Sequence, residues 1–94
     1  MTDPVRHLLR ALQASAAAAG CAVELAHAGE RPWATATFAG ARHRVQATAE
    51  PAALLRWLSM LPEADLPLSG WFVADCMAEV TGGEAMIELL VLET

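Results

Sequence analysis

Lysine, tyrosine and asparagine are absent from this 94-residue chain, and charged residues make up only 18% of it. All six basic side chains are arginine and alanine is abundant, a bias that most simply reflects a GC-rich bacterial genome. The formal net charge of −5 opposes the basic surface with which proteins bind the phosphate backbone of nucleic acids. We therefore expect no nucleic-acid partner.

Cysteine is also scarce. Cys21 and Cys76 lie too far apart for a CxxC motif, so neither a zinc knuckle nor a redox dithiol has support. Each cysteine falls in a strand pattern, which predicts buried thiols rather than a disulfide or a reactive group.

Long apolar runs are missing as well, because no stretch approaches the roughly 20 residues of a membrane span. Residues 18–21 loosely resemble a bacterial lipoprotein cleavage site. Gln13 and Ser15, however, interrupt the apolar segment that export requires. We expect a cytoplasmic protein without a membrane partner.

What the chain does contain is enough apolar sequence, 55%, for one core, which predicts a single domain over residues 1–94. Asp3 and Pro4 suit the N-cap and first position of a helix, and apolar residues then recur at helical spacing up to Gly20. A second amphipathic helix is predicted over residues 51–61, and Pro62 ends it.

Period-two patterns predict about five strands. The first covers residues 21–26 and stops before a turn at 29–32, and the next two, 33–38 and 42–48, are joined by a two-residue loop at Ala39 and Gly40. That register sets Thr37 opposite Arg42 and Ala36 opposite His43, so that His43 faces the core.

A last hairpin is predicted from residues 71–80 and 85–92, joined at Gly82 and Gly83. The element order is then α-β-β-β-α-β-β. The expected fold class is α+β, a two-layer sandwich with both helices on one face of an antiparallel sheet.

This hairpin is apolar on both sides. One side, which includes Phe72, Ala74 and Cys76, is expected beneath the helices, and two helices cover only one face of a sheet. The second side is an apolar patch surrounded by Asp75, Glu79 and Glu88, a pattern typical of an interaction surface. Its apolar residues are Trp71, Val73, Met77, Met86, Leu90 and Leu92.

Three occupants of that side are compatible with the sequence. A second copy of the chain is favoured, because symmetric dimers are the commonest assembly of small soluble chains. The alternatives are the chain's own loop of residues 61–70, and a different protein or a ligand.

A second hypothesis is a small-molecule site for an anionic ligand, or a modest enzyme, in a cleft that needs five side chains to converge. These are Trp33, Arg42, His43, Arg44 and Asp75. No catalytic residue, cofactor or metal site is predicted, because no nucleophile elbow, phosphate loop or dinucleotide fingerprint is present and His7, His27 and His43 form no local pair. His7 and His27 are expected at the surface or rim.

The element order is similar to that of the dimeric chaperones of bacterial type III secretion, which are also small and acidic, although the chain lacks their final helix. The first five elements resemble the double-stranded-RNA-binding domain, which the charge contradicts. Order alone licenses no function. The expected function is a non-enzymatic binding module that acts as a homodimer, with a secretion-chaperone-like or antitoxin-like partner protein as a further alternative.

Overall fold

The computed structural model describes residues 4–94, so the expected N-cap Asp3 lies outside the described residues. Neither helix in this range is long and apolar enough to cross a membrane. In chain order the elements are α1 (Pro4–Ala18), β1 (Glu24–Ala34), β2 (Ala39–Thr48), α2 (Pro51–Met60), the 3-10 helix η1 (Leu61–Glu63), β3 (Trp71–Thr81) and β4 (Glu84–Glu93).

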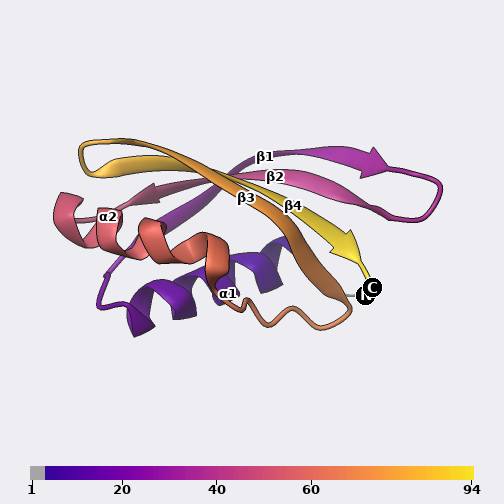
Figure 1. Ribbon diagram of the computed structural model, residues 1–94. Helices are drawn as coiled ribbons and strands as arrows, with labels where there is room; N and C mark the ends of the chain where they lie inside the picture. Colours follow the sequence, from indigo (N-terminus) through magenta and orange to yellow (C-terminus); the bar gives the residue numbers. More distant parts are fainter. Residues whose placement is uncertain (1–3) are drawn as a thin grey trace.

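The strands form one antiparallel sheet in the order β1-β2-β4-β3. Both helices lie on the same side of this sheet, and the β1–β2 hairpin extends beyond them at one end (Figure 1). The predicted α+β class, with two helices on one face of an antiparallel sheet, is confirmed.

The first two predicted strands are a single strand, so the sheet has four strands instead of five. The turn predicted at residues 29–32 is wrong: β1 continues through it, with a bulge between His27 and Gly29. Pro32 is tolerated because β1 is an edge strand, where every second N–H faces away from the neighbouring strand and can be lost without breaking a bond to it.

The turn between β1 and β2 is also longer than predicted. It uses residues 35–38, and Thr35 Oγ1 accepts hydrogen bonds from the backbone N–H groups of Thr37 and Phe38. Ala34 therefore pairs with Ala39, and His43 lies opposite Glu30 rather than Ala36. His43 nevertheless faces the core, as predicted, and is 2% exposed.

The β3–β4 hairpin has the predicted two-residue connection, and its predicted register holds from Thr81 back to Asp75. A bulge between Val73 and Asp75 then reverses the faces of the remaining residues. Trp71 and Val73 pack against the core on the helix side, and Phe72 pairs with Leu92 on the other face. The predicted placement of these three side chains is wrong for that reason.

The core between sheet and helices is built around Trp57, whose side chain is fully buried. Its indole Nε1–H donates a hydrogen bond to Ser15 Oγ at 3.0 Å, which ties α2 to α1. Leu8, Leu12 and Leu54 from the helices meet Ile87 and Leu89 from β4. Glu50 caps α2 by accepting from the N–H groups of Ala52 and Ala53, and these two bonds lower the pKa of its carboxyl.

Gly40 lies in β2, not in a turn, and the reason for glycine is a close approach of the neighbouring strand. A Cβ at this position would overlap the carbonyl oxygen of Val91 and lie 2.8 Å from the Cα of Leu92. Both are backbone atoms, so relief requires a shift of β4 relative to β2.

We predict that Gly40→Ala lowers the free energy of unfolding by about 1–3 kcal/mol, the usual cost of an overpacked interior, measured by urea denaturation. Gly29→Ala is the matched control in the same sheet, because a Cβ there meets nothing within 4 Å. The control should change stability by less than about 0.5 kcal/mol. Equal effects of the two substitutions would contradict this explanation of Gly40.

Candidate functional site

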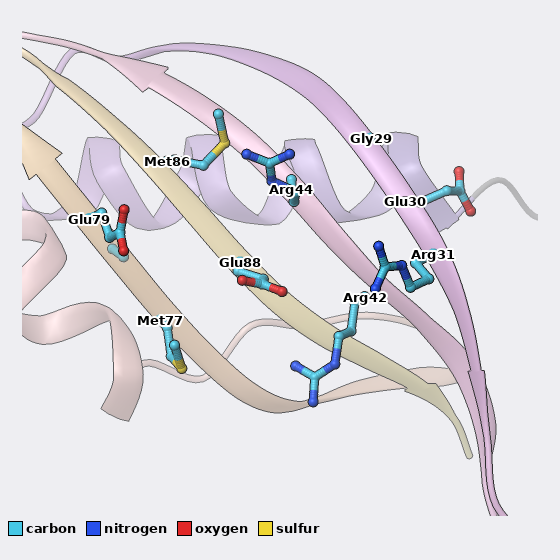
Figure 2. A pocket seen from close by; sticks show the side chains of 10 residues that line it. Gly29, Glu30, Arg31, Arg42, Arg44, Met77, Glu79, Met86 and Glu88 are labelled. Carbon is cyan, nitrogen blue, oxygen red and sulfur yellow. The ribbon is translucent and has the colours of Figure 1, made fainter.

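The face of the sheet opposite the helices carries its arginines and most of its carboxylates on separate strands, with Glu24 at the start of β1 as the exception. We call this face the open face. Arg31 of β1 and Arg42 and Arg44 of β2 lie on one half, and Glu79 of β3 and Glu88 of β4 lie on the other (Figure 2). By register, Asp75 of β3 lies on the same half as these carboxylates. In the part of the chain that the structure describes, none of these arginines forms an ion pair with a carboxylate. Their charges are thus available to a partner.

A hollow of about 530 Å³ lies over the middle of this face. Figure 2 shows Arg31 on β1 and Arg42 and Arg44 on β2, with the Arg42 side chain extending across β4 and with Glu88, Glu79 and Met77 on β4 and β3. Glu30 lies at the rim, and its side chain points away from the arginines. The lining residues are Gly29, Glu30, Arg31, Arg42, Arg44, Met77, Ala78, Glu79, Met86 and Glu88.

The open face exposes less apolar area than the sequence predicts. Leu90 and Leu92 belong to it by register, yet they are only 6% and 4% exposed. Leu92 lies beside Phe72, whose ring meets Phe38 edge-on at 6.0 Å. Of the predicted interface residues, Met77 is 60% exposed and Met86 is partly exposed, while Trp71 and Val73 lie on the helix side.

The loop of residues 61–70 does not cover this face. Its Leu66 and Leu68 pack against the core, and that core lies between the sheet and the helices. The alternative in which this loop buries the second side of the hairpin is therefore excluded.

The five side chains proposed for an anionic ligand do not converge. Arg42 and Arg44 line the hollow, but His43 points to the opposite side of the sheet. Trp33 and Asp75 are on the open face by register but do not line the hollow. The carboxylates of the β3–β4 half also offset the arginines, so the open face as a whole carries no excess positive charge for an anion.

A second cluster of functional groups lies on the helix side of the sheet. His27 Nε2 and His43 Nδ1 are 3.0 Å apart, and a carboxylate oxygen of Glu30 completes a set in which the three ligand atoms lie within 4.8 Å of one another. Burial lowers the pKa of His43 and His27 lowers it further, whereas the Glu30 carboxylate acts to raise it. Imidazole nitrogens and carboxylate oxygens are common protein ligands of zinc and other divalent transition metals.

Sequence reasoning missed this cluster. The sequence predicts His27 at the surface or rim, and His43 lies 16 residues further along the chain, so no short motif joins them. The only available signal is Gly29 next to a strand pattern, which marks a bulge in retrospect. His7, by contrast, lies on α1 and takes no part in the cluster.

The two clusters occupy opposite faces of the sheet, with the charged hollow on the open face and the histidines on the helix side. They are therefore two candidate sites, which share only Glu30 at the rim of the hollow. A scan against protein-family models finds no match, and no curated protein and no solved structure matches the chain.

Both cysteines are free, as the sequence predicts, and Cys21 is buried while Cys76 is partly so. Burial raises the pKa of Cys21. Burial, with a smaller effect of Asp75, raises the pKa of Cys76 to about 11. Since the thiolate is the reactive form, both thiols are poor nucleophiles near neutral pH.

We predict that Cys76, isolated in a Cys21→Ala variant, reacts with Ellman's reagent at pH 8 about 100-fold more slowly in the folded protein than in urea. The factor follows from a pKa of about 11 against an ordinary value of 9.0, because the rate follows the thiolate fraction. Equal rates in the folded and unfolded protein would show that this thiol is not shielded.

Proposed function

We propose that the chain is a non-enzymatic interaction module of the bacterial cytoplasm that works as a homodimer, with its open face packed against the same face of a second copy. The single observation that carries this proposal is the division of charge on that face. Arginines occupy the β1–β2 half, and the carboxylates of the face, apart from Glu24 at the start of β1, occupy the β3–β4 half.

A two-fold axis that lies between two stacked sheets and runs parallel to their strands turns this division into complementarity. It sets the β1–β2 half of each copy over the β3–β4 half of the other. Arg44, whose register partner is Glu88, then lies over Glu88 of the second copy. Arg31 and Asp75 lie at opposite edges of the sheet in the same register row, Arg31–Arg42–Leu90–Asp75. Arg31 therefore lies over Asp75 of the second copy.

The perpendicular choice of axis is unfavourable. A two-fold axis running across the strands sets each half over itself, so that arginines meet arginines and carboxylates meet carboxylates. Like charges brought together at an interface cost several kcal/mol. The charge pattern thus selects one way of stacking, close to the aligned packing of β-sandwiches.

Met77 and Met86 supply apolar contact between the charged groups. Met77 is 60% exposed in the single chain, which is a large exposure for a methionine in a strand. Methionine side chains are flexible and adapt to a facing surface. Burial of the two methionines would add hydrophobic stabilisation to the charge pairs.

The same pattern favours a second copy over the other occupants. An anionic ligand gains little from a face whose arginines are offset by the carboxylates of Asp75, Glu79 and Glu88. A secretion-chaperone-like or antitoxin-like role requires a different protein as partner. Each charged half of this face is instead complementary to the other half of the same face on a second copy.

We predict that Arg44→Glu and Glu88→Arg each weaken dimerisation more than about 100-fold, because each substitution creates two like-charge contacts per dimer. An equimolar mixture of the two variants should restore the dimer, since the carboxylate introduced at position 44 then faces the guanidinium introduced at position 88 of the other chain. Sedimentation equilibrium at low ionic strength measures both effects. A dimer has twice the chain mass of 10.0 kDa.

The mixture separates contacts between chains from contacts within a chain. Residues 44 and 88 are neighbours in the register of one sheet, and the like charges within each variant chain persist after mixing. Arg10→Glu on the exposed side of α1 is the control with the same charge change, and it should stay dimeric. A monomeric wild-type protein, or a mixture that stays monomeric, would overturn the proposal.

A further inference from the structure

We propose that His27, Glu30 and His43 form a binding site for one divalent transition metal ion of the zinc class. The two histidines lie on the helix side of the sheet, opposite the proposed dimer face, and Glu30 lies at the strand edge between the two faces. The site combines two imidazole nitrogens with one carboxylate oxygen, all three ligand atoms lying within 4.8 Å of one another.

The spacing of the two nitrogens fits a shared ion. His27 Nε2 and His43 Nδ1 are 3.0 Å apart, and two ligands of a tetrahedral zinc with bonds of about 2.0–2.1 Å are ~3.3 Å apart. A shift of a few tenths of an ångström therefore admits the ion. The Glu30 side chain is exposed and flexible, so it can close the remaining distance by a change of rotamer.

The bulge in β1 is what creates this ligand set. In a regular strand, residues three apart point to opposite faces, so His27 and Glu30 would be separated by the sheet. The extra residue between His27 and Gly29 restores both side chains to the helix side, where Glu30 lies opposite His43 on β2. Bulges are enriched next to functional sites, where they redirect side chains in this way.

The donor types select the class of ion. Neutral imidazole suits zinc and other first-row transition metals, whereas magnesium and calcium require sets made of oxygen. In the absence of metal, the N–H group of one imidazole donates a hydrogen bond to the facing nitrogen of the other. On binding, that proton moves to the second nitrogen of the same ring, which leaves both facing nitrogens with a lone pair for the ion.

The three ligand residues differ in their exposure to solvent, so the ion has a path into the site. His43 is buried, His27 is partly exposed and Glu30 is exposed. The ion can enter from the Glu30 side and reach the imidazoles behind it. Three protein ligands leave at least one coordination position for water or a small ligand, as in zinc sites of this donor composition.

The test is a titration of the metal-free protein with Co²⁺ and Zn²⁺. We expect one Co²⁺ per chain with the visible absorption of four-coordinate cobalt, its displacement by Zn²⁺, and a rise in the melting temperature on Zn²⁺ binding. His27→Ala and Glu30→Gln should fold normally, because both side chains have access to solvent. Each should weaken binding; loss of the imidazole should cost more than about 100-fold.

His7→Ala is the matched control, because it removes a histidine that lies outside the cluster, and it should bind metal like the wild type. Circular dichroism confirms that each variant is folded. No binding by the folded wild-type protein, or undiminished binding by His27→Ala, would overturn the proposal. Arg44→Glu should retain full metal binding, which keeps this result separate from the fate of the dimer.

Discussion

One extra residue in each edge strand decides which chemistry each side of this sheet presents. The bulge in β1 lies between His27 and Gly29, and the bulge in β3 lies between Val73 and Asp75. Because side chains alternate along a strand, each bulge shifts every residue beyond it to the other face. The first brings Glu30 to the side of His43 and turns Arg31 toward the open face. The second moves Trp71 into the core and leaves Asp75 outside.

The outcome is a sheet with a different environment on each side. The helix side contains the apolar core around Trp57 and, near the edge, the His27–His43 pair with its carboxylate. The open side is a charged surface on which Leu90 and Leu92 are nearly inaccessible and Met77 is exposed. An interface formed by this face would be stabilised by the arrangement of its charges rather than by hydrophobic area. Charge arrangement at an interface favours specificity and orientation over raw affinity.

Much of the fold could be predicted from local patterns. The spacing of Leu8 and Leu12, and the proline that ends α2, identify the helices, and Gly82 with Gly83 fixes the last hairpin as far as Asp75. Alanine at positions 28 and 74 has no turn or bulge signature, so the β3 bulge has no signal in the sequence and the β1 bulge is marked only by Gly29. The pairing of His27 with His43 depends on the β1 register and is invisible to short motifs. The apolar pattern of the last hairpin also overstated the exposed area, since neighbouring side chains cover Leu90 and Leu92.

Burial of the open face in the dimer is the central claim, and the methionine methyl signals of the native protein test it most directly. Met77 and Met86 lie on that face, whereas Met60 lies on α2, away from it, and is 51% exposed. In the presence of a soluble paramagnetic probe, the account predicts sharp signals from Met77 and Met86 and a broadened signal from Met60. Broadening of Met77 to the same extent as Met60, as its 60% exposure in a single chain would give, would contradict it.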